Sequence, residues 1–243
     1  MSKHKKRKHH ETGTKKKGEM LAAEVRGAEW VGDNFRLVDL LAKGCREEKW
    51  RPGAKLKVDV GDGTTRTFTP ISMKAKSGRV RILVYIHGPS PASQWASTIR
   101  SGDKTYTSVP RSSLDVNDLR SPVVFFGDET SFGTAKTLQS HLGADFPVYC
   151  SFEVKEPRQA QAVVKKLELA NVTLIKSREN RSHLDEIVRN LQRAMTNLAT
   201  KHLIMTGNGR SIQGLRAALQ ANNATQLEYV VKAYWTPEKK LRD

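Results

Sequence analysis

The sequence contains only two cysteines, Cys45 and Cys150, and no Cys-x-x-Cys pair. Two isolated thiols cannot build the ligand cage of a structural zinc site or an iron–sulfur cluster, so redox chemistry would need a bound organic cofactor. No apolar run approaches the roughly 20 residues that cross a bilayer, and no apolar segment follows the charged N-terminus as in a secretory signal. These absences predict a soluble, cytoplasmic protein of one or two domains.

Acidic residues are scarce, with 25 Asp and Glu against 42 Lys and Arg and a formal net charge of +17. Such an excess suggests a polyanionic partner such as a nucleic acid. Much of it lies in residues 1–18, MSKHKKRKHHETGTKKKG, which have no apolar residue beyond Met1 and which we expect to form a disordered basic tail. The functional alternatives for this tail are a weak polyanion contact or metal capture by its histidines, His4, His9 and His10.

The first half of the chain alternates apolar and polar residues. Every second residue is apolar in AKLKVDV at 54–60, and the same alternation recurs in RVRILVYIH at 79–87. This pattern is typical of strands with one buried face, and Asp62-Gly63 and Ser77-Gly78 supply turn residues. We therefore expect an antiparallel β-barrel or sandwich over residues 19–115.

The second half alternates predicted strands and helices. Pro157 opens one predicted helix, and Ser182 with Asp185 predicts a capping box at the start of another. The predicted strands are VVFF at 123–126, FPVYCSFEV at 146–154, NVTLIKS at 171–177, HLIM at 202–205 and LEYVVKAYW at 227–235. This order predicts an α/β domain with a parallel, doubly wound sheet over residues 120–243, an architecture typical of nucleotide binding.

Two loops of the α/β half follow predicted strands, which is where open parallel sheets bind ligands. Residues 127–130, GDET, follow VVFF, and residues 206–210, TGNGR, follow HLIM. Neither loop is a GxGxxG fingerprint or a Walker loop. Each is therefore either an ordinary connecting turn or part of a cofactor site.

The segment RTFTP at 66–70 alternates an arginine, an aromatic ring and a hydroxyl on a predicted strand. Arg66 offers a bidentate fork for phosphate, Phe68 can pack on a flat heterocycle, and Thr69 can hydrogen-bond a ring atom. The alternative is an ordinary surface strand. Farther on, HGPSPASQW at 87–95 predicts a turn that leads into a helix, a second candidate anion site, although a histidine such as His87 is more often structural than catalytic.

In this order, the motifs resemble those of the siderophore-interacting proteins, a branch of the ferredoxin-NADP reductase superfamily. The resemblance spans about residues 20–236 and is carried by WRPG at 50–53, RTFTP at 66–70, HGPSPASQWA at 87–96, GDETSFGTA at 127–135, TGNGRSIQGLR at 206–216 and YW at 234–235. It implies an N-terminal FAD-binding β-barrel and a C-terminal NAD(P)H-binding domain. It also implies an NAD(P)H-dependent ferric-siderophore reductase that releases ferrous iron.

The resemblance also assigns site residues position by position. The flavin contacts it implies are Arg66, Phe68, Thr69, Pro70, His87, Gly88, Pro91, Ala92, Ser93 and Trp95. The nicotinamide and dinucleotide contacts it implies are Gly127, Asp128, Glu129, Thr130, Gly207 and Arg210. Trp235 either lies near the flavin or closes the sheet. No catalytic side chain is expected, because the flavin carries the chemistry.

The sequence departs from the family pattern at both cofactor sites. Phe68 stands where the family usually has tyrosine, and the loop at 87–96 is one residue shorter than HG-x-x-GPAS-x-WA and lacks the glycine before Pro91. This chain has GDETSFGT where the family usually has GDETALPA. It has TGN where the family has AGE, so that Asn208 replaces an acidic residue. Two rival functions therefore stay open: a flavin reductase or electron-transfer protein with a non-siderophore acceptor, and a non-catalytic polyanion-binding protein on a degenerate reductase scaffold.

Basic residues supply the last candidates. A basic rim would concentrate an anionic ferric chelate, and the candidates are Lys74, Lys76, Arg79 and Arg81. Lys155 and Arg158 follow the second strand of the α/β half, where related folds bind a ribose 2'-phosphate, and so favour NADPH over NADH. We expect a monomer without a metal site.

Overall fold

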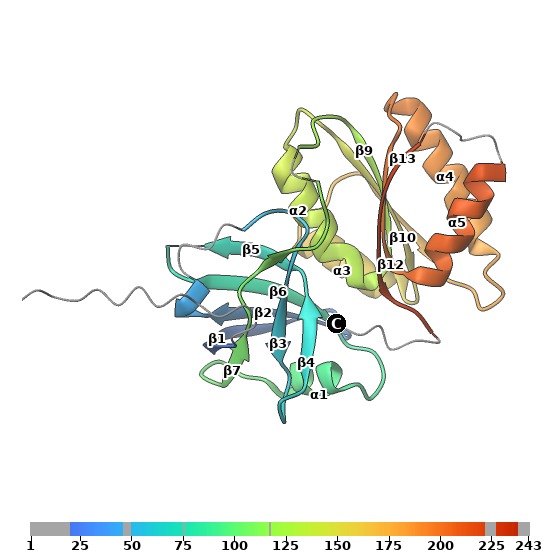
Figure 1. Ribbon diagram of the computed structural model, residues 1–243. Coiled ribbons are helices and arrows are strands. Elements are labelled where there is room, and N and C mark those ends of the chain that lie inside the picture. Colours follow the sequence, from blue (N-terminus) through green and yellow to red (C-terminus); the bar gives the residue numbers. More distant parts are fainter. Residues whose placement is uncertain (1–19, 46–49, 75, 117, 222–226, 238–243) are drawn as a thin grey trace, which may run out of the picture.

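The computed structural model describes residues 20–45, 50–74, 76–116, 118–221 and 227–237. The basic tail predicted at 1–18 lies outside these residues. Within the described ranges, no helix combines the length and apolar character needed to cross a membrane. The chain folds into an antiparallel β unit followed by a parallel α/β unit, and the fold class predicted from the two alternating patterns is confirmed (Figure 1).

The N-terminal unit is an eight-stranded antiparallel sheet that curls into a half-barrel. Its order is β4-β3-β7-β1-β2-β6-β5, with β8 paired to β3. The two ends of the sheet, β4 and β5, are joined through the single residue Thr69, so the sheet must curl to bring them together. The strands are β1 (Leu21–Val31), β2 (Phe35–Leu41), β3 (Ala54–Asp59), β4 (Thr65–Phe68), β5 (Pro70–Lys74), β6 (Arg79–Tyr85), β7 (Lys104–Thr107) and β8 (Arg111–Ser112).

Alternating burial explains this half-barrel. In β3 every second residue is buried, and Leu56 and Val58 pack with Val25, Leu40 and Ile82 in one apolar core. A short 3-10 helix, η1 (Lys43–Cys45), follows β2, and α1 (Pro91–Thr98) packs its Ala96 into the same core. The polar residues of these strands therefore face outward, as period-two alternation requires.

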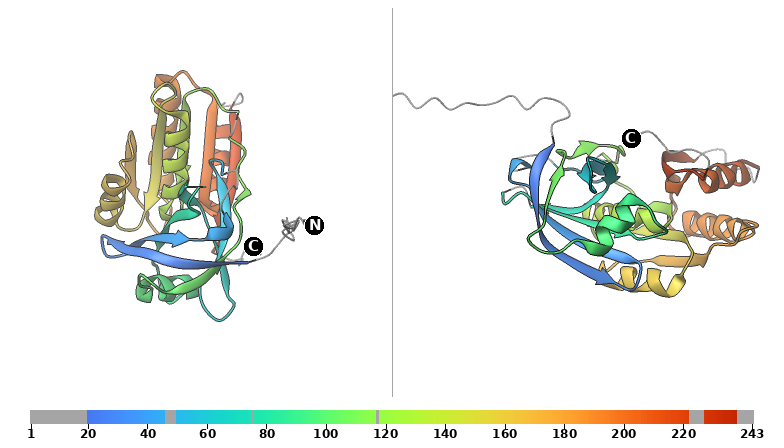
Figure 2. Two further views of the ribbon diagram at one scale, coloured as in Figure 1. Left: turned by 90° about the vertical axis from the view of Figure 1, so that its left-hand side faces the viewer. Right: turned by 90° about the horizontal axis from the view of Figure 1, so that it is seen from below.

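The C-terminal unit is a five-stranded parallel sheet of order β11-β10-β9-β12-β13. Helices cover both of its faces (Figures 1 and 2). The strands are β9 (Val123–Gly127), β10 (Val148–Val154), β11 (Val172–Lys176), β12 (His202–Asn208) and β13 (Glu228–Trp235). The helices are η2 (Glu129–Ser131), α2 (Phe132–Leu142), α3 (Pro157–Lys166), α4 (His183–Asn197) and α5 (Gly209–Ala221).

The helix starts agree only in part with the sequence. Pro157 occupies the first turn of α3, as predicted. The capping box predicted from Ser182 and Asp185 is wrong, because Ser182 has helical backbone angles and its side chain makes no cap hydrogen bond. Instead, the amide of Ser182 donates to Asn180 Oδ1, so a local turn orders the start of α4.

The two units share an apolar core. Phe132 at the start of α2 packs 5.8 Å from the ring of Phe35 in β2 and 4.4 Å from that of Phe152 in β10. Ile71 of β5 belongs to the same cluster. At the turn between β1 and β2, the amide of Asp33 donates to Gln159 of α3 over 2.7 Å. Helix α2 lies between the two sheets, and this shared core fixes the half-barrel against the α/β unit (Figure 1).

The order of the parallel sheet creates a switch point. From β9 the chain continues through β10 to β11 on one side, and it then returns to β12 and β13 on the other side. The loops that follow β9 and β12 consequently leave the sheet in opposite directions. Parallel sheets of this kind bind their ligands between two such loops.

Candidate functional site

The carboxyl ends of β9 and β12 bring Asp128 and Gly207 together. Asp128 follows Gly127, the last residue of β9, and is only 2% exposed. Gly207 has a φ of +98°, and a Cβ at this position would lie 2.5 Å from Asp128 Cγ. Glycine is therefore required here on two grounds, its backbone conformation and the close approach of Asp128. The two loops singled out in the sequence meet at the switch point.

Trp235 covers this meeting point. It ends β13 beside Asn208, and its Nε1 donates a hydrogen bond of 2.7 Å to Asp128 Oδ2. The amide of Thr130 donates to the other carboxylate oxygen over 2.9 Å. Burial raises the pKa of Asp128, while the hydrogen bonds from Thr130 and Trp235 lower it. Trp235 remains 39% exposed, so it lies over the switch point rather than inside the sheet.

Glu129 lies at the boundary between the two units. Its Oε1 accepts the amide of Lys155 at 2.6 Å and the hydroxyl of Tyr85, from the half-barrel, at 3.4 Å. Burial raises the pKa of Glu129 to about 7. His87 stacks on Tyr85 with ring centroids 5.1 Å apart. The predicted contacts Glu129 and His87, which are far apart in the sequence, thus belong to one cluster.

The RTFTP segment contains β4, an edge strand of the half-barrel, and its Thr69 contacts α2 of the α/β unit. All four residues of β4 are half-buried, unlike the alternating residues of β3 beside it. Phe68 packs on the half-barrel core and lies 6.4 Å from the ring of Trp95. Arg66 Nη1 donates to the carbonyl of Thr65, and Pro70 is buried at the start of β5. Thr69 lies between these strands and contacts α2.

The loop at 87–95 leads into α1 as predicted, but Ser93 has a structural role in it. Ser93 is 3% exposed, and its hydroxyl accepts the amide of His87 and donates to the carbonyl of the same residue. Its own amide donates to Ser90, the N-cap of α1. The side chain of Ser93 is thus occupied in shaping the loop, because a buried hydroxyl must find partners nearby. Gly88 precedes this turn, and Pro91 and Ala92 form the first turn of α1.

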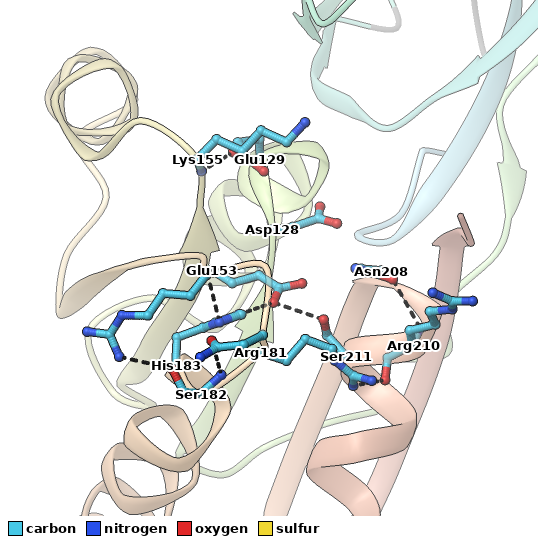
Figure 3. Close-up of polar contacts among 12 residues, drawn as sticks. Asp128, Glu129, Glu153, Lys155, Arg181, Ser182, His183, Asn208, Arg210 and Ser211 are labelled. Carbon is cyan, nitrogen blue, oxygen red and sulfur yellow. Dashed lines mark hydrogen bonds and ion pairs between the residues drawn. The ribbon is translucent and has the colours of Figure 1, made fainter. Parts of the chain in front are cut away.

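A basic cluster of three arginines, of which the sequence predicted only Arg210, follows β11 and β12, and Figure 3 labels Arg181 and Arg210 of it. Arg178 and Arg181 belong to the loop between β11 and α4, and the predicted Arg210 occupies the first turn of α5. Arg181 Nη2 donates to the carbonyl of Arg210 over 2.8 Å. Arg181 has a φ of +61°, an uncommon conformation for a residue with a side chain. All three side chains are exposed, and they bring positive charge to the N-terminal ends of α4 and α5.

A buried hydrogen-bond network supports this basic cluster. Glu153 Oε2, near the end of β10, accepts Nε2 of His183 at 3.0 Å and the hydroxyl of Ser211 at 2.9 Å (Figure 3). Nδ1 of His183 accepts the amide of Arg178 at 3.0 Å, so the proton of a neutral ring resides on Nε2. Burial raises the pKa of Glu153. The network ties the arginine loop and the start of α5 to the sheet.

The cations proposed for a ferric chelate lie elsewhere. Lys74, Lys76, Arg79 and Arg81 belong to the β5–β6 hairpin. Arg81 forms a bidentate pair with Asp39, at 2.7 and 2.8 Å, and Arg79 approaches the same carboxylate. Lys74 is at the far end of β5 from Thr69, roughly 15 Å away at the rise of an extended strand. The structure therefore does not bring this group together with the switch-point residues.

The sequence rule that found the other loops could also have found the arginines. Arg178 and Arg181 directly follow the end of β11, just as GDET follows β9. No sequence signal predicts the Glu153 network, because its members come from three separate elements. Lys155 follows β10 and Arg158 lies in the first turn of α3, and both side chains are exposed.

Family models match the chain in two consecutive pieces. Residues 41–114 match the siderophore-interacting FAD-binding domain, and residues 121–238 match the siderophore-interacting protein model. These segments contain the half-barrel strands from β3 onward and the whole parallel sheet. A comparison with curated protein sequences found no match.

Several solved structures share the fold. The siderophore-interacting protein from Acinetobacter baumannii has a TM-score of 0.69 and 17% identity, over 92% of this chain and 93% of that one. The ferredoxin reductase in carbazole 1,9a-dioxygenase has a TM-score of 0.69 and 12% identity, over 89% of this chain and 70% of that one. Full-length CYP116B46 from Tepidiphilus thermophilus has a TM-score of 0.68 and 16% identity over 89% of this chain, which spans only 29% of that longer protein.

At these identities the solved structures establish the fold alone, and the family models add the family. An antiparallel half-barrel that matches an FAD-binding domain is followed here by a five-stranded parallel sheet that matches the siderophore-interacting model. The chain belongs to the siderophore-interacting protein family and has a ferredoxin reductase-like fold.

Proposed function

We propose that this protein binds FAD, takes reducing equivalents from NADPH or NADH, and reduces a ferric siderophore so that ferrous iron is released. The observation that carries the proposal is the contact between the two motif regions. Thr134 Oγ1, in the helix that follows GDET, donates to Thr69 Oγ1 at 3.4 Å. A flavin held along β4 and a nicotinamide at the switch point would therefore meet at one junction.

The residues present fit a flavin. The half-buried strand β4 presents a cation, an aromatic ring and, next to it, the hydroxyl of Thr69 at the boundary between the two units. Arg66 would hold a phosphate, Phe68 would pack on a ring, and Thr69 would hydrogen-bond a ring atom. The start of α1 would meet the pyrophosphate through the Pro91–Ala92 backbone. The Ser93 hydroxyl would then shape this loop without touching the cofactor.

The chemistry would come from the cofactor, since FAD can accept a hydride and pass on single electrons. This chain's residues would orient the two rings and exclude water from the junction. Glu129, with a pKa raised to about 7, would hold a proton there at neutral pH without contributing a full negative charge. Ferrous iron is held less tightly than ferric iron by hard oxygen ligands, so reduction would favour release.

The visible spectrum tests the proposal directly. Purified protein titrated with FAD should show the absorption of a bound flavin, and anaerobic NADPH or NADH should bleach it. A ferric siderophore added next should restore the oxidised band, and a panel of other acceptors would reveal a non-siderophore reductase. FAD that binds but does not bleach with either donor would contradict the proposed donor site. Failure to bind FAD would overturn the proposal as a whole.

We propose further that the donor's phosphates contact the basic cluster of Arg178, Arg181 and Arg210. Each charge-assisted hydrogen bond to a phosphate is worth about 1.5–3 kcal/mol. Arg178→Ala combined with Arg181→Ala should therefore raise the KM for NADPH at least about tenfold, with a smaller change for NADH, because only NADPH carries a 2'-phosphate. Steady-state kinetics with both donors measures this.

Two control variants locate the phosphate. Arg189→Ala removes an exposed arginine from α4, outside the cluster, and should leave both KM values unchanged. Lys155→Ala with Arg158→Ala tests the residues selected from the sequence alone. If that pair, and not the arginine loop, raises the KM for NADPH, the phosphate lies beside α3 and the assignment to the loop is wrong.

A further inference from the structure

A chain of hydroxyl groups crosses the boundary between the half-barrel and the α/β unit. Thr134 Oγ1 lies 2.7 Å from the hydroxyl of Tyr234 and donates to Thr69 Oγ1 at 3.4 Å. The Tyr234 hydroxyl also lies near the side chains of Thr69 and Thr206. Thr206 in turn donates to Ser131 over 2.8 Å. Five hydroxyls from separate parts of the chain thus gather in one network, in which Tyr234 lies between the hydrogen-bonded set of Thr69 and Thr134 and the hydrogen-bonded pair of Thr206 and Ser131.

Three of the five hydroxyls are shielded from solvent, while Thr69 and Tyr234 belong to half-buried residues. Thr134 is 1% exposed, and Thr206 and Ser131 are fully buried. Burial also raises the pKa of Tyr234, so its phenol stays protonated and can donate. Because water cannot replace a missing partner at the three buried positions, the hydroxyls there are oriented by their neighbours. The hydrogen bond that Thr69 accepts comes from one of these buried hydroxyls, Thr134 of the other unit.

The orientation of Thr69 depends on these hydroxyls because Thr69 is not paired with a residue of a neighbouring strand. Phe68 pairs with Leu56, and Pro70 pairs with Ile82, but Thr69 lies between these two ladders. The start of α2 approaches it closely, since a Cβ on Gly133 would lie 3.4 Å from the Thr69 carbonyl oxygen. Its backbone is thus packed against α2, and its hydroxyl accepts from Thr134, which is in turn hydrogen-bonded to Tyr234.

We infer that Thr134 and Tyr234 are positioning residues that orient the Thr69 hydroxyl toward the flavin ring. The inference rests on the proposed function, in which Thr69 contacts the flavin. Thr134 and Tyr234 themselves do not touch the cofactor. They act across the boundary between the units, so the flavin site of the half-barrel is complete only when α2 and β13 are in place.

Hydroxyl-deleting variants test the inference with FAD binding as the readout. Thr134→Val keeps the shape of the side chain, and Tyr234→Phe keeps the ring. Each should weaken FAD binding about three- to tenfold, the value of one hydrogen bond, and should alter the shape of the visible flavin band. Thr134→Ser should restore both properties. Flavin fluorescence titration and absorption spectra measure them without requiring turnover.

A matched control is available on the same helix. Thr137 is as buried as Thr134, but its hydroxyl donates within α2 to the Thr134 carbonyl. Thr137→Val should therefore lower the free energy of unfolding without changing FAD affinity or the spectrum. Thr69→Val should weaken FAD binding, and adding Thr134→Val to it should weaken binding no further, because both changes act through one hydroxyl.

The outcomes separate this inference from the proposed function. If Thr69→Val weakens FAD binding while Thr134→Val and Tyr234→Phe bind as the wild type does, the positioning role is wrong and the proposed function stands. If Thr69→Val also leaves affinity and spectrum unchanged, Thr69 does not contact the flavin and the inference falls. If the wild-type protein does not bind FAD, the proposed function itself fails.

Discussion

Gly207→Ala is expected to lower the free energy of unfolding by about 3–5 kcal/mol, the largest effect among the changes considered. At a φ of +98° an alanine is strained by its backbone alone. Its Cβ would also lie 2.5–2.7 Å from the carboxyl group of Asp128, which is buried and hydrogen-bonded to Trp235. Asp128 could move away only by giving up these bonds. Urea unfolding of both proteins measures the difference.

Gly102→Ala separates the two contributions. Gly102 has nearly the same backbone angle, with a φ of +97°, but no atom lies within 4 Å of an added Cβ. Backbone strain alone should therefore lower the free energy of unfolding of this variant, by about 1–2 kcal/mol. Equal decreases in the free energy of unfolding at both positions would show that the Asp128 side chain moves away from the added Cβ at little cost. The close approach of Asp128 to β12 would then not stabilise the fold.

Glu129→Gln is expected to remove much of the pH dependence of stability between about pH 5 and 7. The pKa of Glu129 rises from 4.5 in the unfolded chain to about 7 in the folded protein. In that interval the folded state holds a proton that the unfolded state has released, so stability falls as pH rises. A shift of this size corresponds to roughly 3 kcal/mol. The neutral glutamine avoids the cost of burying a charge.

The variant should therefore match the wild type near pH 5 and exceed its stability near pH 8 by about 2–3 kcal/mol. Urea unfolding at several pH values checks this. Glu228→Gln is the control, because Glu228 is exposed and Lys201 lowers its pKa, which places its titration below the interval. Parallel curves for the wild type and Glu129→Gln would mean that Glu129 is already ionised in the folded protein at pH 5.

Much of the fold followed from local patterns. Alternation in AKLKVDV indicated a strand with one buried face, and β3 shows that alternation residue by residue. Pro157 marked the start of α3 correctly, because a proline lacks the amide that a first turn leaves free. The capping box at Ser182 failed because the backbone there is already helical and the turn at Asn180 takes over its amide.

The site was predictable only in part. Loops that follow parallel strands gather at one edge of the sheet, so GDET and TGNGR could be placed together from order alone. The departures from the family pattern in these loops could not be interpreted, yet Thr134 is hydrogen-bonded to Tyr234, and Thr206, which bonds Ser131, lies near the same tyrosine. Contacts between residues so far apart in the sequence produce no local sequence pattern from which they could be predicted.

The sequence alone determined the two units, their order and the positions of the two motif loops, because apolar periodicity and strand order act over short stretches of chain. Only the tertiary structure decided that Trp235 donates to Asp128, that Glu129 joins Tyr85 to Lys155, and that Arg79 and Arg81 pair with Asp39. The contact between Tyr85 and Glu129 depends on packing the two units together, and the other interactions depend on which strands lie side by side within one unit. Burial and hydrogen-bond partners are properties of that packing, and neither is encoded in the spacing of residues along the chain.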